Sequence, residues 1–159
     1  MGAHGAGETD RDAMKPRKAP RKHVAVGSWV ELGGQRFYAR SKAERARAEV
    51  LEILRVAGLV RSWKHEPKTF YFPNVKRGSV SYKPDFEVTS IRGTVTYQEV
   101  KGWWDAKSVQ KLALMARHYP DVVIETIGAQ LKPAQRARIE KARDVGMRAA
   151  AKKAKSDVE

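Results

Sequence analysis

The sequence predicts a single α/β domain in which a small mixed β-sheet is flanked by helices. Segments with the apolar spacing of helices occur together with shorter segments that are rich in β-branched and aromatic residues. Their order is helix, three strands, helix and strand, which is typical of a sheet covered by helices. The chain has 159 residues, enough for one substantial hydrophobic core but not for two.

Two segments open the folded region. Residues 24–38, interrupted by two glycines, predict a short hairpin or an extended lead-in. Residues 41–57 predict a helix, because Ser41 is a typical N-cap, Glu44 follows at the capping-box distance, and Gly58 marks the end. Glu44 lies at the margin of the apolar stripe of this helix, so its carboxylate can point toward the sheet. The members of that stripe are Ala43, Val50, Leu51, Leu54 and Ala57.

The remaining core elements follow in order. Residues 63–72 predict a strand, and residues 81–89 and 94–100 predict the two strands of a central hairpin joined by a glycine turn. Residues 105–119 have helical spacing, and residues 122–127 predict a short buried strand. The residues of the second helix that we expect to face inward are Val109, Leu112, Ala113, Met115 and Ala116.

Composition divides the chain into three parts. Residues 1–22 combine glycine, alanine, proline and scattered charges without apolar periodicity, so they predict a flexible basic arm. Residues 23–131 contain the predicted core elements and form the central domain. Residues 132–159 are rich in alanine, lysine and arginine, which predicts a basic C-terminal helix or tail.

The net charge points to a polyanionic partner. The chain has 32 lysine and arginine residues against 18 aspartate and glutamate residues, a formal net charge of +14. A net charge of about 2 to 8 is sufficient to keep a small domain soluble. A larger positive excess favours binding to phosphate backbones through the release of counterions. We therefore expect a nucleic-acid ligand, with an acidic membrane surface as the weaker alternative.

The absence of cysteine limits the kinds of metal site and catalytic site that the chain can form. It excludes disulfide frameworks, thiolate zinc sites and cysteine nucleophiles, and leaves a metal held by oxygen atoms as an option. No apolar stretch resembles a secretory signal or a membrane span. We therefore expect a soluble, intracellular protein of the cytoplasm without a membrane partner.

Two carboxylates and a lysine come together on the predicted central hairpin. Asp85 follows Pro84 in the first strand, and Glu99 and Lys101 are two residues apart in the second, so these two share a face. Carboxylates in such a place need a cationic partner or a metal. Their oxygens suit Mg²⁺ or Mn²⁺, which polarise a phosphoryl group and lower the pKa of bound water, while an ammonium group orients that water. Glu44, reaching in from the first helix, can hold a second ion.

These residues resemble a known nuclease signature. The segment 84–86 (Pro-Asp-Phe) followed by the segment 99–101 (Glu-Val-Lys) is similar to the motif of the PD-(D/E)XK nuclease superfamily in spacing and in strand context. Over about residues 37–127, the chain also resembles phage and archaeal Holliday-junction resolvases and several small phage endonucleases. The segments that carry this second resemblance are residues 41–44, 84–86 and 99–102 and the basic helix after the tryptophan pair.

The resemblance implies a restriction-endonuclease-like core, with residues 23–131 as the nuclease domain, and it implies a role for each site residue. Asp85 and Glu99 are then metal ligands, the Val100 backbone carbonyl adds a third oxygen, and Lys101 is the catalytic lysine. Glu44 corresponds to the acidic residue of the first helix and completes the catalytic and metal-binding set. The implied cofactor is Mg²⁺, with Mn²⁺ as a substitute. A phage-encoded enzyme of this kind would act in the cytoplasm of the host cell.

Two further residues are accessory candidates. Ser41 resembles a serine near the site of archaeal resolvases, although its N-cap position explains it equally well. Gln98 precedes Glu99 in the manner of the superfamily, although strict strand alternation directs its side chain away from Glu99. The segment Gly102-Trp103-Trp104 departs from the family pattern.

Each candidate also has a purely structural interpretation. Asp85, Glu99 and Lys101 can form ion pairs on a solvated sheet face, worth about 0.2 to 1 kcal/mol. Glu44 can be the acidic half of a capping box. The two tryptophans can be core aromatics, or one can stack on an exposed base.

We interpret the chain as a metal-dependent endonuclease that resolves four-way DNA junctions by paired phosphodiester hydrolysis. We expect a homodimer, because a twofold pair supplies two active sites for two cuts. The alternatives are a general or nicking phage endonuclease that acts on linear DNA, a nuclease fold that binds DNA without cutting it, and a basic RNA-binding protein. The residues that we expect to contact DNA are Lys42, Lys76, Arg77, Trp103, Trp104, Lys107 and Lys111.

Overall fold

The computed structural model describes residues 27–156, so the predicted basic arm (residues 1–22) lies outside the described part of the chain. Eleven helices and strands are present within residues 27–156. In chain order they are β1 (Ser28–Leu32), β2 (Gln35–Ala39), α1 (Lys42–Val56), β3 (Val60–His65), β4 (Phe70–Tyr71), β5 (Ser81–Tyr82), β6 (Phe86–Ser90), β7 (Val95–Lys101), α2 (Ala106–His118), β8 (Ile124–Gly128) and α3 (Pro133–Ser156).

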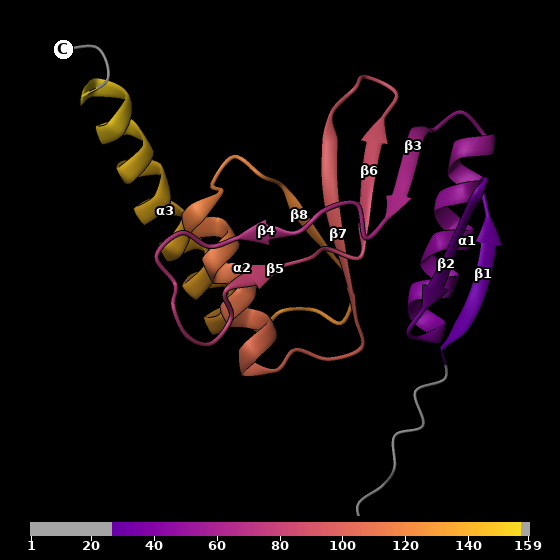
Figure 1. Cartoon of the computed structure of the whole chain (residues 1–159), viewed down its shortest axis with the longest axis horizontal. Helices are drawn as coiled ribbons and strands as arrows, with labels where there is room; N and C mark the ends of the chain where they lie inside the picture. Colours follow the sequence, from indigo (N-terminus) through magenta and orange to yellow (C-terminus); the bar gives the residue numbers. More distant parts are fainter. Residues whose placement is uncertain (1–26, 157–159) are drawn as a thin grey trace, which may run out of the picture.

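A four-stranded mixed sheet lies at the centre of the molecule (Figure 1). Its strand order is β3-β6-β7-β8, in which β3, β6 and β7 pair antiparallel and β8 pairs parallel to β7. A parallel pair needs a crossover connection, and α2 supplies it between β7 and β8. The predicted α/β fold with a small mixed sheet flanked by helices is therefore confirmed.

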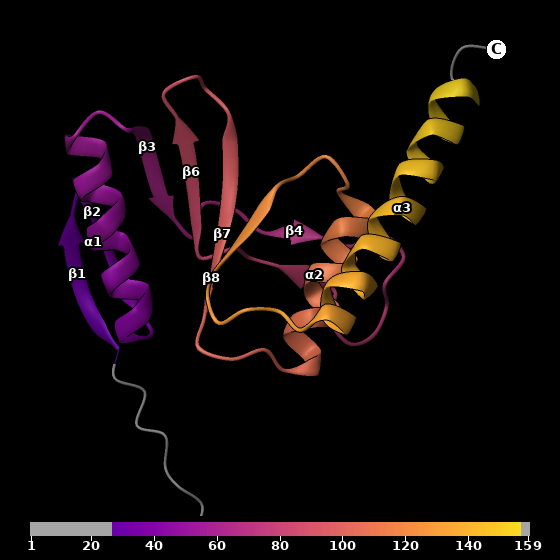
Figure 2. The ribbon, with the colours of Figure 1, turned by 180° about the vertical axis from the view of Figure 1, so that it is seen from behind.

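The two faces of the sheet are covered by different elements (Figures 1 and 2). Helix α1 and the β1-β2 hairpin cover one face, where Leu51 of α1 packs with Trp63, Phe86 and other buried residues. On the other side, α2 and the small β4-β5 ribbon share a second cluster. Its buried members are Phe70, Phe72, Tyr82, Tyr97, Leu112 and Met115.

Helix α3 packs against α2, away from the central sheet (Figure 2). Gly146 is the buried residue of α3, and a Cβ atom at this position would lie 2.2 Å from the carbonyl oxygen of Arg117. The missing side chain allows the two helices to approach closely. The basic C-terminal segment therefore includes a regular helix that contacts the rest of the fold.

Several predicted elements are confirmed. Helix α1 begins after Ser41, whose hydroxyl accepts a hydrogen bond from the backbone N–H of Glu44 at 3.1 Å. The segment before it is a true hairpin, because both glycines of its turn have positive φ angles, as a tight turn between strands requires. In α2, the five residues predicted to face inward are the five that are buried.

Two predicted strands are interrupted. The segment 63–72 divides into β3 and β4, because the chain leaves the central sheet at Glu66, which has a φ angle of +40° and is followed by Pro67. The segment 81–89 divides into β5 and β6 around Pro84, which has no N–H group to donate to a strand ladder. These breaks transfer the chain between the β4-β5 ribbon and the central sheet.

The predicted apolar stripe of the first helix is wrong in part. Glu44, Ala48 and Leu51 are the buried residues of α1, whereas Ala43 and Val50 are exposed. Helix α1 is therefore rotated so that the Glu44 side faces the sheet and an apolar row remains on its outer surface. Sequence periodicity did not distinguish these two faces, since both carry apolar residues.

Candidate active site

The start of β6 lies beside the end of β7 and brings Asp85 to Glu99. Phe86 pairs with Gln98 in the antiparallel register, so the preceding residue, Asp85, is adjacent to Glu99. Two hydrogen bonds extend the pairing: the Asp85 N–H donates to the Gln98 carbonyl at 3.1 Å, and the Val100 N–H donates to Asp85 Oδ2 at 2.7 Å. The position of the Asp85 carboxylate is therefore determined by the backbone of the strand that carries the Glu-Val-Lys segment.

Glu99 is held from two sides. Its side chain is buried, and Lys101 Nζ forms an ion pair with Oε1 at 2.9 Å. The hydroxyl of Tyr82, which is also buried, donates to Glu99 Oε2 at 2.8 Å. Strand alternation places Glu99 and Lys101 on one face of β7, as predicted, and the β4-β5 ribbon supplies the tyrosine.

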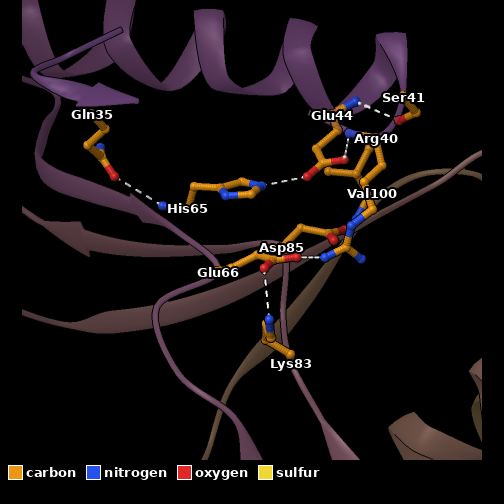
Figure 3. Close-up of polar contacts among 9 residues, drawn as sticks. All are labelled: Gln35, Arg40, Ser41, Glu44, His65, Glu66, Lys83, Asp85 and Val100. Atoms are coloured by element: carbon orange, nitrogen blue, oxygen red, sulfur yellow. Dashed lines mark hydrogen bonds and ion pairs between the residues drawn. The ribbon is translucent and has the colours of Figure 1, made fainter. Parts of the chain in front are cut away.

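Glu44 approaches from α1 and is tied to a histidine (Figure 3). Its Oε1 lies 2.6 Å from His65 Nε2, and its Oε2 accepts the backbone N–H of Arg40 at 2.8 Å. Both side chains of the Glu44–His65 pair are less than one-tenth exposed, and the imidazole ring stacks on Phe37 with a centroid distance of 4.2 Å. The carboxylate of Glu44 is thus fixed in one orientation toward the end of the sheet.

The three carboxylates lie close enough to influence one another. Burial and the negative charges of Glu99 and Glu44 raise the pKa of Asp85 to about 6, although the Val100 N–H and the Lys101 charge act in the opposite direction. Burial alone would raise the pKa of Glu44, but its bonds to His65 and to the backbone of Arg40 lower that pKa below its ordinary value. The nearby positive charge therefore does not offset the effects of burial and of the two neighbouring carboxylates on the pKa of Asp85.

The negative charge of Glu99 also raises the pKa values of Lys101 and Tyr82. Burial alone would lower the pKa of Lys101, but the hydrogen bond to Glu99 and the charges of Glu99, Asp85 and Asp105 raise it above its ordinary value. Lys101 therefore remains a cation at neutral pH. Burial, followed by the charge of Glu99 and the hydrogen bond to it, raises the pKa of Tyr82 well above its usual range, so this residue remains a donor.

The donor set suits a hard divalent cation, although its present arrangement is not that of a closed metal cage. Carboxylate oxygens from Asp85 and Glu99 are the ligand type preferred by Mg²⁺ and Mn²⁺. Within residues 27–156, no group of three or more His, Asp or Glu side chains is arranged so that it could hold a metal ion as it stands. The high pKa of Asp85 nevertheless shows a site that added positive charge would stabilise. Few protein ligands and several water ligands are the usual coordination of Mg²⁺.

A second polar cluster borders Asp85 (Figure 3). The backbone N–H of Glu66 donates to the carbonyl of Asp85 at 2.8 Å. The Glu66 carboxylate pairs with Arg40 and with Lys83, whose Nζ lies 2.9 Å from Oε2. Two exposed cations are thus positioned at the rim of the candidate site.

The two accessory candidates lie in different places. Ser41 is the N-cap of α1, three residues from Glu44, and its hydroxyl bonds to the backbone of that residue. Gln98 is buried on the opposite face of β7 from Glu99, where it accepts from Arg47 Nε and donates to Glu125 Oε2, both at 2.9 Å. The structure therefore does not bring Gln98 together with the carboxylates of the site.

The expected DNA contacts are spread over several elements. Lys42 is exposed at the start of α1, Lys76 and Arg77 are exposed in the loop between β4 and β5, and Lys107 is exposed on α2, where Lys111 is half-buried. The two tryptophans differ in how far they are exposed. Trp103 is 71% exposed, whereas Trp104 is half-buried and donates its indole N–H to the Ala129 carbonyl at 2.8 Å.

Sequence analysis missed three residues that contact the candidate site: His65, Tyr82 and Glu66. His65 and Tyr82 reach their carboxylates across 21 and 17 residues of sequence, and neither belongs to a motif with recognisable spacing. Their one local signal was a position inside the predicted strands, residues 63–72 and 81–89. Only the packing of α1 and of the β4-β5 ribbon against the sheet reveals these pairs.

Comparison of the chain with models of protein families, with curated proteins and with solved structures finds no match. Among residues 27–156, no helix is both long enough and apolar enough to span a lipid bilayer.

Proposed function

We propose that the protein is a metal-dependent DNA endonuclease that cuts branched DNA. The observation that carries this proposal is the position of Asp85, Glu99 and Lys101 at adjoining strand ends, with the pKa of Asp85 raised by neighbouring carboxylates. Ion pairing on a solvated sheet face does not account for this site, because Glu99 is buried and the charge of Lys101 does not offset the effects of burial, Glu99 and Glu44 on Asp85. A divalent cation would supply the missing positive charge and could in turn bind the negatively charged phosphodiester.

Asp85, Glu99 and the Val100 carbonyl are the proposed holders of Mg²⁺ or Mn²⁺. When bound, such an ion polarises the phosphoryl group and lowers the pKa of bound water. The chain itself holds the two carboxylates in position. Asp85 is kept in place by the Val100 N–H, and Glu99 by the Tyr82 hydroxyl, so both carboxylates are held in defined positions.

Lys101 is the proposed catalytic cation. Its side chain is one-third exposed and its ammonium group remains protonated, so it can contact both Glu99 and an incoming phosphate oxygen. In that position it orients the attacking water or stabilises the negative charge that develops on the phosphate. Glu44 lies at the side of Asp85, and its bond to His65 keeps it ionised and correctly directed for a second cation.

A nucleic-acid substrate follows from the charge of the chain and from its exposed residues. A net charge of +14 exceeds what solubility needs, and two exposed cations, Arg40 and Lys83, lie at the rim of the site through their pairs with Glu66. Trp103, two residues after Lys101, offers an exposed aromatic surface to an unstacked base. Regular duplex DNA exposes few such bases, whereas a branch point does, so we favour a four-way junction cut by a homodimer.

Cleavage of an immobile four-way junction tests the proposal. The junction, a linear duplex and a single strand of matched sequence would be incubated with Mg²⁺, Mn²⁺ or EDTA. We expect paired cuts in the junction that depend on the metal. Equal cutting of linear DNA would place the enzyme among general or nicking endonucleases, and binding without any cutting would indicate a DNA-binding module.

A further inference from the structure

A pocket lies directly after the end of β7, beside the candidate site. Its volume is about 360 Å³, which is within the range of pockets that hold small organic ligands. One wall is the loop after β7, which begins at Gly102, the residue that follows Lys101. The other wall is the segment that joins β8 to the first turn of α3. A ligand in this pocket would therefore lie next to the proposed catalytic lysine without covering it.

The backbone of Ala129 joins the two walls. Strands β7 and β8 are parallel and Lys101 pairs with Gly128, so both walls follow the carboxyl ends of neighbouring strands. The Ala129 N–H donates to the Lys101 carbonyl at 2.8 Å, and the Ala129 carbonyl accepts the indole N–H of Trp104 at 2.8 Å. In open α/β sheets, ligands commonly bind outside the carboxyl ends of parallel strands. The pocket is thus held open by the sheet and by two hydrogen bonds.

The lining combines an aromatic surface with hydrogen-bond donors. Trp103 is 71% exposed, so its indole ring is accessible to a ligand. The side-chain oxygen of Gln130 accepts from Arg136 Nη2 at 2.8 Å. The side-chain oxygen of Gln135 accepts the backbone N–H of Lys132, also at 2.8 Å. These bonds leave the amide N–H groups of both glutamines as donors for a ligand.

This lining matches the chemistry of a nucleotide. A nucleobase has a flat face that stacks on an aromatic ring, and acceptor atoms on its edge for amide donors. Lys132 adds a positive charge for the phosphate, and none of the described residues that line the pocket is acidic. A purely apolar ligand would displace water from the two glutamine amides and leave them without partners.

We propose that this pocket binds an unpaired base of the DNA strand, close to the phosphate that is cut. Trp103 stacks on the face of the base, Gln130 and Gln135 donate to its edge, and Lys132 contacts a neighbouring phosphate. The inference rests on the proposed function and deepens it, because it names the part of the substrate that is recognised. A branch point offers unpaired bases and a regular duplex does not, so the pocket would select branched DNA.

A comparison of two DNA probes in EDTA tests the pocket without any cleavage. One probe is a duplex that carries a single unpaired thymidine, and the other is the same duplex with an abasic nucleotide in that place. The probes have the same charge and the same backbone, so they differ only in the base. We expect the wild type to bind the probe with the base at least about 5-fold more tightly, as measured by fluorescence anisotropy. Equal affinities would overturn the proposal.

Three variants locate the base. Trp103→Ala should abolish the preference for the probe with the base, and Gln130→Leu, which removes the amide at similar size, should reduce it. Trp29→Ala is the matched control, because Trp29 is 65% exposed but lies on β1, and it should keep the full preference. Circular dichroism checks that each variant is folded. The full preference in Trp103→Ala or in Gln130→Leu would overturn the assignment of the pocket.

The pocket and the nuclease function fail separately. A base preference without metal-dependent cleavage of a four-way junction would refute only the nuclease function. Junction cleavage without a base preference would refute only the pocket.

Discussion

Asp85 accepts the backbone N–H of Val100 at 2.7 Å, and this bond joins the first carboxylate of the candidate site to the strand that carries the other residues. Val100 lies between Glu99 and Lys101, so any movement of Asp85 relative to β7 would disturb the whole group. The side chains are therefore positioned by the sheet itself. Such positioning is what a hydrolytic site requires for catalysis.

Asp85→Asn should abolish cleavage while junction binding remains within a few-fold of the wild type. The amide oxygen can still accept the Val100 N–H, but it offers a much weaker ligand to a divalent cation. Cleavage and gel-shift assays on the same junction measure the two effects separately. Simultaneous loss of binding would assign Asp85 a role in folding and not in catalysis.

The stability of the metal-free protein should decrease as pH rises through about 4 to 6. The folded state holds the Asp85 pKa at about 6, above its ordinary value of 3.8, so in this window the folded chain binds more protons than the unfolded chain. Above pH 6 the ionised carboxylate should cost on the order of 2 kcal/mol, after allowance for its partial exposure. Asp85→Asn should remove this dependence. Urea unfolding in EDTA at several pH values measures it, and parallel profiles for the two proteins would contradict the raised pKa.

Lys101→Ala should lower the cleavage rate by several powers of ten with little change in metal affinity. The ammonium group lies beside Glu99 and Asp85 but is not itself a metal ligand, and in the proposed mechanism it acts on the attacking water or on the phosphate. Its removal should therefore lower the rate more than the metal affinity. Lys64→Ala is a matched control, because Lys64 is an exposed lysine on β3 and is not among the expected DNA contacts. Single-turnover cleavage and metal titration would separate the two effects. Near-normal cutting by Lys101→Ala would exclude the lysine from the mechanism.

His65→Ala should reduce activity by about 10- to 100-fold, the usual effect of removing a group that orients a metal ligand. The bond of 2.6 Å to Glu44 is lost in this variant, while Asp85, Glu99 and Lys101 keep their own contacts. The reduction should be smaller at high Mg²⁺ or Mn²⁺ concentration, which a purely structural role would not produce. His118→Ala serves as the control, since His118 lies beside Phe72 in the other core cluster.

Trp103→Ala should reduce the preference for branched over linear DNA, whereas Trp104→Phe should lower thermal stability. The first indole is 71% exposed, but the second donates to the Ala129 carbonyl and anchors the loop after Lys101. Competition between junction and duplex measures the preference, and thermal unfolding measures stability. Unchanged selectivity in Trp103→Ala would show that this residue does not contact the branch point.

Much of the fold was predictable because its signals are local. The Ser41 cap, the spacing of apolar residues in α2 and the glycine turns are short-range patterns, and each is confirmed in the structure. The divisions between β3 and β4 and between β5 and β6 were not predicted. At each division a strand ends because the chain moves to a different sheet, and the sheet that a strand joins depends on pairing with strands far away in the sequence.

The sequence by itself determined the strong positive charge, the order of the main helices and strands apart from the two divided strands, and the spacing that puts Glu99 and Lys101 on one face of a strand. Only the tertiary structure decided which face of α1 is buried, which carboxylate His65 holds, and that Tyr82 secures Glu99. The physical reason is that periodicity is set along one element, whereas burial and hydrogen bonding are set between elements far apart in the chain. Helix α1 is the clearest case, because its apolar pattern does not reveal that Leu51 is buried against the sheet while Val50 and Ile53 remain exposed.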